Sequence, residues 1–379
     1  YDYLEPIQRP GEISSEDEDS LRNLTSEVKS AYEAYHVDQT IEYFERILHI
    51  LTQNLNIPLL SFVCNDFLPI ALSIIKRRAD NQDLVGVIFR VLIQLTYTNR
   101  DYAIEIINSG LQSAIRPYLD FNCGWNSILC IILLNNVQVS EDACTFFDNL
   151  EITKILDFAS YMLKEGQMKH LVRFLALYSM KNVPDDICDA ILNVFGEALD
   201  THDTDVYEMI VFGVYNLLEN SEVSTNFLSN QFLIDLVSQM VPVCPTPALS
   251  IIRATLERTG WILTNPTIVF EGATKNLQYT IEVLTDLIRS EKCPCDKSVA
   301  IFICNSMEQL LHGSYKEKSI IMSLIKAFYS KAHEEDLIEM IFEALLQSVA
   351  DLLPSDHQYS SLGWRSIHLL FDELSDSQE

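Results

Sequence analysis

A pattern of about 40 residues recurs along this chain, and it constrains the fold more than any other feature of the sequence. The clearest copy is YTNRDYAIEIINSGLQSAI, residues 97–115, in which the hinge residue Asn99 precedes an amphipathic helix and Ser109-Gly110 ends it. Similar hinges occur at three other asparagines, Asn54, Asn136 and Asn220. A lone helix pair cannot bury its apolar face, whereas stacked copies share one continuous core. The recurrence therefore predicts a helical repeat protein in preference to an irregular helical bundle.

The composition also favours helices joined by short connections. The 379 residues include only 11 Gly and 12 Pro, and 48% of the residues are hydrophobic. So few turn-forming residues argue against sandwiches and barrels, and this apolar content supplies a sizeable core. We expect an all-α, right-handed α-solenoid of about seven or eight repeats.

The predicted solenoid occupies residues 21–371. Residues 1–20 contain two prolines and a run of serine and acidic residues, so we expect a flexible acidic arm there. Residues 372–379 are expected to form a short acidic tail. Trp364 is expected to cover the exposed end of the last helix pair, because terminal repeats need a cap.

The charge balance is strongly acidic. The chain has 54 Asp and Glu against 26 Lys and Arg, a formal net charge of -28. A field of this sign repels phosphate backbones and anionic lipids, so we expect neither nucleic acid nor a membrane surface as a partner. It favours Lys/Arg-rich peptides or basic proteins, although solubility alone would also account for it.

The nine cysteines are irregularly spaced and lie mostly in apolar helical contexts, as reduced core residues do. No signal-peptide pattern opens the chain. Residues 121–140 carry no charged side chain, but polar amides interrupt them, so a buried helix is expected there instead of a membrane span. We therefore expect a monomer in the cytoplasm, the nucleus or both.

The sequence carries no recognisable catalytic motif. It lacks the glycine-rich, nucleophile-elbow and His-Glu-x-x-His patterns of common enzymes. Cys293-Pro294-Cys295 has no second pair or nearby histidine to complete four zinc ligands, so we interpret these cysteines as structural. We predict no cofactor, no metal and no catalytic residue, and hence a protein that is not an enzyme.

The repeat resembles those of the armadillo family, which run a hinge Asn, an amphipathic helix, a break of small residues around Gly, and an apolar helix. Residues 97–115 have this form, and LENSEVSTNFLSNQFLIDLV at 218–237 repeats it. VFEGAT at 269–274 is similar to the Glu-Ala-Gly-Ala break of the family. Most breaks here use Asn or Asp in place of Gly, and both tolerate the left-handed backbone conformation. The resemblance covers residues 40–350 and implies an armadillo-type solenoid.

Within this family, the importin-alpha branch binds an extended peptide through Trp-x-x-x-Asn pairs on the third helix of each repeat. Trp261 and Asn265 have this spacing, and Asn216 lies four residues before the hinge residue Asn220. Amides both donate and accept hydrogen bonds, and Trp is the best cation–π partner for Lys and Arg. The resemblance implies a peptide site that includes Gln94, Trp125, Asn216, Trp261 and Asn265.

Structural roles for these residues stay open. Trp261 also fits a core or capping aromatic residue at a helix end, Asn265 also fits a hinge, and Asn216 also fits a buried bridge between helices. We expect a non-enzymatic scaffold whose concave groove binds an extended basic peptide, as in a nuclear-import adaptor. The acidic residues 1–20 depart from the basic N-terminal segment of that branch. The alternative is a HEAT-like regulatory or structural subunit, or an assembly chaperone, that docks folded partners.

Overall fold

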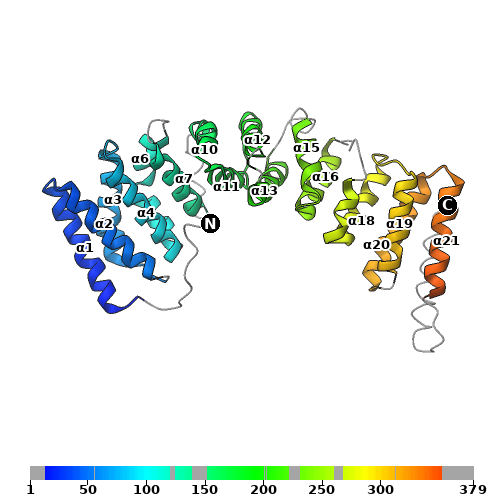
Figure 1. The fold of residues 1–379 in the computed structure, drawn as a ribbon, viewed down its shortest axis with the longest axis horizontal. Coiled ribbons are helices and arrows are strands. Elements are labelled where there is room, and N and C mark those ends of the chain that lie inside the picture. The colour runs from blue at the N-terminus through cyan, green and yellow to red at the C-terminus, as the bar shows by residue number, and fades with distance from the viewer. Residues whose placement is uncertain are drawn as a thin grey trace. The chain divides into compact units, whose positions relative to one another are not determined.

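The computed structural model describes residues 13–54, 56–119, 124–138, 152–199, 201, 203–221, 231–259, 268–311 and 313–351. These residues form helices joined by short turns (Figure 1). The chain divides into two compact units, which are described separately. Unit 1 comprises residues 1–180 and 190–213, and unit 2 comprises residues 181–189 and 214–379.

The helices of the first half of the chain are α1 (Ser15–Glu33), α2 (Val37–Gln53), the π-helical η1 (Val63–Phe67), α3 (Leu68–Arg77), α4 (Gln82–Thr98), α5 (Asp101–Asn108), α6 (Leu111–Ile115), the 3-10 helix η2 (Arg116–Leu119), α7 (Trp125–Gln138), α9 (Ile152–Leu156), α10 (Ala159–Lys164) and α11 (Met168–Tyr178). The later helices are α12 (Asp185–Leu199), α13 (Thr204–Asn220), α15 (Gln231–Met240), α16 (Pro245–Thr259), α17 (Ile268–Glu271), α18 (Ala273–Arg289), α19 (Lys297–Leu310), α20 (Tyr315–Lys331) and α21 (Glu335–Asp351).

In unit 1, the long helices α2, α4, α7 and α11 stack side by side, and each contacts the next (Figure 1). We call them the ladder helices of unit 1. Helices α3 and α6 contact each other and form a second layer, and α10 packs on α11. The core lies between the layers, because the side chains on the facing surfaces of both are apolar and fully buried.

Unit 2 repeats this arrangement. Helices α16, α18 and α20 stack in order and are its ladder helices. Helices α15, α19 and α21 form the second layer of unit 2. Helix α15 packs on the ladder helix α16, and α19 contacts both the ladder helix α20 and its second-layer neighbour α21. In both units a ladder helix therefore packs against the preceding ladder helix, so that successive copies bury one another's apolar faces.

The clearest repeat folds as its sequence predicts. The hinge residue Asn99 ends α4, and its Oδ1 accepts a hydrogen bond of 2.9 Å from the Asp101 backbone N–H. Gly110 then separates α5 from α6 with a φ of 105°, a left-handed conformation that glycine adopts without steric cost. The two sequence marks of the repeat are thus the two places where the backbone changes direction.

Hydrogen bonds link equivalent positions of neighbouring repeats in unit 1. Tyr102 Oη donates to the Pro58 carbonyl at 2.8 Å and accepts a hydrogen bond from the Leu60 backbone N–H at 3.0 Å. Tyr118 Oη donates to the Ile75 carbonyl at 2.6 Å. Both tyrosines are fully buried. These partners are 42 to 44 residues apart in sequence, so the period of the sequence is also the spacing of the contacts.

The first helix begins earlier than the predicted boundary at residue 21. Helix α1 starts at Ser15, and Ser14 Oγ caps it by accepting a hydrogen bond from the Asp17 backbone N–H. The acidic residues that suggested a flexible arm occupy the first turn, where carboxylates stabilise the positive end of the helix dipole. Residues 1–12 and 352–379, and with them Trp364 and the predicted tail, lie outside the described residues.

The uncharged window around residue 130 forms a buried helix, as expected. Helix α7 buries Ile128, Cys130 and Leu134 among other side chains of the core. In the part of the chain that the structure describes, no helix has the length and apolar character needed to cross a bilayer.

Replacing Tyr102 with Phe tests the links between repeats. The change leaves the buried Leu60 N–H and the Pro58 carbonyl without their partner, so we expect the free energy of unfolding to fall by about 1–3 kcal/mol. Urea unfolding followed by circular dichroism measures it. The exposed Tyr97→Phe variant is the control and should change the free energy by less than about 0.5 kcal/mol. Equal effects of the two substitutions would contradict this role of Tyr102.

Candidate protein-binding surface

Most of the surface of α4, α7 and α11 is buried, and a narrow part of each helix remains open to solvent. On α4 the exposed positions after the first turn are Arg90 and Tyr97, which are two helical turns apart. Most exposed or half-buried positions of α7 and α11 recur at intervals of four or seven residues, which places them on one face of each helix, while Gln138 and His170 fall outside this spacing. We call this surface the ladder stripe, and it consists of Arg90, Tyr97, Trp125, Ile132, Asn136, Lys169, Arg173 and Leu177.

Asparagines of α7 fix the register of the ladder helices beneath and beside the stripe. Asn126 Nδ2 donates to the Gln82 carbonyl of α4 at 3.0 Å, and Asn135 Nδ2 donates to the His170 carbonyl of α11 at 2.9 Å. A Cβ on Gly86 would lie 3.0 Å from Asn126 Oδ1, so a glycine there leaves room for this amide. The polar residues of α7 thus tie three ladder helices together.

Trp125 is the predicted site residue that lies on the ladder stripe. It is the first residue of α7 and is 51% exposed. Tyr97, on the adjacent helix α4, is 46% exposed. Exposed tryptophan and tyrosine side chains are typical anchors of protein interfaces.

The other predicted site residues have different surroundings. Gln94 is buried, and its Nε2 donates to the Leu51 carbonyl at 3.4 Å, which links α4 to α2. Asn216 is also buried, in α13, and its backbone carbonyl accepts a hydrogen bond from Asn220 Nδ2. Trp261 and Asn265 lie outside the described residues. Peptide contacts by these four residues stay predictions.

The structure brings Gln94 and Trp125 onto adjacent ladder helices of unit 1, whereas Asn216 belongs to unit 2. Sequence reasoning missed Tyr97, Arg90 and Asn136. Tyr97 and Arg90 could have been found from their seven-residue separation on a helix whose other central residues are apolar. Asn136 was interpreted only as a hinge. It is half-buried near the end of α7, and its Nδ2 donates to Thr96 Oγ1 at 3.0 Å.

The charge of the ladder stripe differs from that of the whole chain. Helices α4, α7 and α11 contain one acidic residue, Asp83, against Arg90, Lys169 and Arg173. Burial, together with the positive charges of Lys169 and Arg173, lowers the pKa of His170 on α11 to about 4. The ladder stripe is therefore locally basic in a strongly acidic protein.

Carboxylates outnumber basic side chains on α2, the ladder helix that packs alongside α4. Asp38, Glu42 and Glu45 are exposed on α2 together with one basic residue, Arg46. The ladder surface of unit 1 thus changes from acidic on α2 to basic on α11. Such a gradient of charge would orient a bound segment that carries both signs.

The ladder helices of unit 2 present a different surface. Arg253 Nε of α16 lies 3.0 Å from Asp286 Oδ2 of α18, and Ser250 Oγ is hydrogen-bonded to the Tyr279 hydroxyl at 2.8 Å. Arg289 Nη2 of α18 donates to Ser323 Oγ of α20 at 2.7 Å. Because many of these polar groups pair with one another across the helices, the open aromatic surface of unit 1 is the stronger candidate for binding.

The described residues contain no group of three His, Cys, Asp or Glu side chains placed to hold a metal ion. Burial raises the pKa of Cys293 to about 12 and that of Cys295 to about 11. Both thiols are therefore protonated near neutral pH, and a protonated thiol is a poor nucleophile and a poor metal ligand.

Two solved structures resemble the chain in fold. An engineered protein from the Northeast Structural Genomics Consortium matches with a TM-score of 0.59 and 11% identity over 94% of this chain and 96% of its own. A structure reported for a phosphorylation switch in the interaction between cadherin and beta-catenin matches with a TM-score of 0.53 and 12% identity over 94% of this chain and 79% of its own. No protein-family model and no curated protein matches the chain.

These comparisons define the class of protein. At such low identity the likeness shows the fold alone. Together with the stacked helices of both units, it confirms the predicted all-α solenoid fold.

The low pKa of His170 predicts an acid sensitivity of the fold. The unfolded chain binds a proton near pH 6.5 and the folded chain near pH 4, so the contribution of the neutral imidazole to stability is lost as the pH falls through this window. Its loss can reach about 1.4 kcal/mol for each pH unit.

We expect His170→Gln to flatten the decline in stability between these two pH values, as measured by urea unfolding at a series of pH. An NMR titration of the imidazole in the unmodified protein should give a pKa near 4. An unchanged slope in the variant would contradict this assignment.

Proposed function

We propose that the chain is a non-enzymatic protein-binding scaffold that holds an extended segment of a partner along the ladder stripe of unit 1. The observation that carries this proposal is the exposure of Trp125 and Tyr97 on adjacent ladder helices. Repeat solenoids present long open surfaces of this kind to extended ligands. Both aromatic side chains offer a large apolar face at a small cost in conformational entropy.

Polar groups of the stripe suit a peptide backbone. Asn136 is half-buried near the C-terminal end of α7, where its Nδ2 donates to Thr96, the neighbour of Tyr97 in α4. An amide side chain can form further hydrogen bonds as both donor and acceptor beyond this one. An extended segment exposes its own N–H and C=O groups along its length. An amide beside an aromatic anchor at the C-terminal ends of α4 and α7 would therefore help to hold such a segment, and Trp125 offers a second anchor at the N-terminal end of α7.

The charge gradient of the stripe indicates what the segment carries. Exposed carboxylates on α2 favour Lys or Arg at one end, in agreement with the net charge of the chain. Arg90 and Lys169 favour Asp or Glu over α4 and α11. We therefore propose a segment of mixed charge, basic over α2 and acidic towards α11, which narrows the basic-peptide prediction to one part of the surface.

A nuclear-import adaptor is the narrower form of this proposal. It rests on the resemblance of the repeats to the importin-alpha branch, and with it go a cytoplasmic and nuclear location and a monomeric state. It requires that a purely basic peptide bind more tightly than a mixed one. The alternative, a subunit or chaperone that docks folded partners, requires an exposed apolar patch in place of the stripe.

Replacing Trp125 with Ala tests the stripe. We expect synthetic peptides of equal length with mixed, basic or acidic charge to bind in the order mixed, basic, acidic, measured by fluorescence anisotropy. Trp125→Ala should lower the affinity for the mixed-charge peptide at least about tenfold, because an aromatic anchor contributes more than about 1 kcal/mol to the binding free energy.

Tyr315→Ala in unit 2 is the matched control, since Tyr315 is also strongly exposed and lies on a different unit. Circular dichroism of both variants verifies the fold. The stripe is excluded as the binding surface if the two variants bind alike. Tightest binding of the basic peptide would favour the import-adaptor form.

The double change Glu42→Lys with Glu45→Lys tests the orientation by charge. It removes two carboxylates from α2 and adds two positive charges. We expect weaker binding of the mixed and basic peptides, tighter binding of the acidic peptide, and a smaller loss of affinity on raising the salt concentration. Unchanged relative affinities of the three peptides would rule out a role of α2 in selecting the segment.

A further inference from the structure

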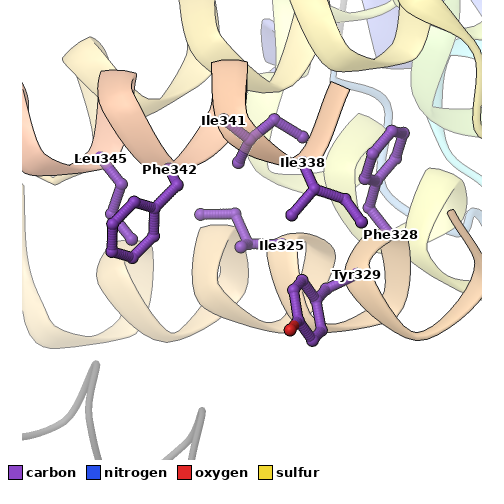
Figure 2. A pocket seen from close by; sticks show the side chains of 7 residues that line it. All are labelled: Ile325, Phe328, Tyr329, Ile338, Ile341, Phe342 and Leu345. Carbon is purple, nitrogen blue, oxygen red and sulfur yellow. The ribbon is translucent and has the colours of Figure 1, made fainter. Parts of the chain in front are cut away.

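The end of unit 2 holds an apolar groove between α20 and α21. Figure 2 shows side chains of both helices pointing into the same space. The cavity has a volume of about 250 Å³, and its lining is apolar apart from one tyrosine hydroxyl: Ile325, Phe328, Tyr329, Ile338, Ile341, Phe342 and Leu345. Phe342 is 50% exposed at this groove. An open apolar surface of this kind marks a place where something else packs.

The repeat itself indicates what is missing from the groove. One step earlier in unit 2, α20 packs against both α18 and α19 and buries Ile321, Leu324 and Phe328. A ladder helix therefore fills the groove between the preceding ladder helix and the second-layer helix before it. Helices α20 and α21 form the next such groove, and within the described residues no ladder helix comes after α21.

We propose that residues 361–374 of this same chain form the terminal ladder helix and fill the groove. The segment reads SLGWRSIHLLFDEL, and Trp364, Ile367, Phe371 and Leu374 recur at intervals of three and four residues. This spacing places all four on one face of a helix.

The dimensions of the segment agree with this role. Its 14 residues equal the length of the ladder helix α7 and would span about 21 Å as a helix. The nine residues between Asp351 and the segment include Pro354, which cannot continue a helix and so separates α21 from the proposed terminal helix. The chain outside the described part is therefore long enough to return to the groove.

A cap from the same chain also accounts for the apolar character of both the groove and the proposed helix. Terminal repeats of a solenoid need an element that is apolar towards the core and polar outside. The groove offers no charged side chain, and the proposed helix offers an aromatic and aliphatic face. A second copy of the chain or a separate partner would leave that face of residues 361–374 without a surface to bury it.

The test uses the full chain with Trp125→Phe and Trp261→Phe, so that Trp364 is the remaining one of the three tryptophans. We expect blue-shifted emission and weak acrylamide quenching of Trp364. Phe342→Asp should shift the emission to the red and raise the quenching constant several-fold. Ile301→Asp, on α19 and similarly exposed but outside the groove lining, should leave both unchanged.

Solvent-exposed emission of Trp364 without the groove substitution would overturn the proposal, as would equal effects of Phe342→Asp and Ile301→Asp. Sedimentation at several concentrations identifies a second copy, because burial of Trp364 would then depend on concentration, and that outcome also overturns it.

A second variant decides the case in which Phe342→Asp fails to fold. In the full chain, Trp364→Glu should raise hydrogen exchange of the amides in α20 and α21 several-fold. The neighbouring Arg365→Glu, which falls on another face of the proposed helix, should not. Equal exchange in these two variants would exclude residues 361–374 as the occupant.

Discussion

The hydrogen bonds that join neighbouring repeats are the interactions on which the rest of the structure depends. Tyr102, Tyr118 and Asn126 each reach a backbone carbonyl about one repeat earlier in the chain. A buried polar group without a partner costs free energy. Only one register of stacking satisfies these hydrogen bonds, so they stabilise that register relative to others. The apolar core favours any close stacking, whereas these bonds specify which helix faces solvent and where along it the open stripe runs.

The same register creates two different ladder surfaces. In unit 1, asparagines of α7 bond to backbone carbonyls below the surface, which leaves Trp125 and Tyr97 open. In unit 2, charged and hydroxyl side chains of α16, α18 and α20 pair with one another across the surface. Exposed pairs of this kind contribute little to stability, but they occupy groups that a ligand would otherwise use. One repeat architecture therefore supports one open surface and one largely self-paired surface.

The charge of the ladder stripe differs from the net charge of the chain for a physical reason. The net charge sums over every side chain, while a bound segment senses those within about a Debye length, roughly 8–10 Å at ordinary salt concentrations. The carboxylates of unit 1 concentrate on α1 and α2, and α4, α7 and α11 carry three basic side chains and one acidic residue. The acidic residues 16–19 before Leu21 belong to the first turns of α1, where they stabilise the positive end of its dipole.

The sequence by itself determined the fold class, because the hinge at Asn99, the break at Gly110 and the 40-residue period are local marks of a helix-turn-helix repeat. The resemblance of the repeats to the importin-alpha branch also named Trp125 as a candidate site residue. Only the tertiary structure decided which residues of each ladder helix face solvent. Gln94 and Tyr97 are three residues apart, yet the amide of Gln94 is buried against Leu51 and the ring of Tyr97 is open. That difference depends on the crossing of α2 over α4, which helical periodicity alone does not specify.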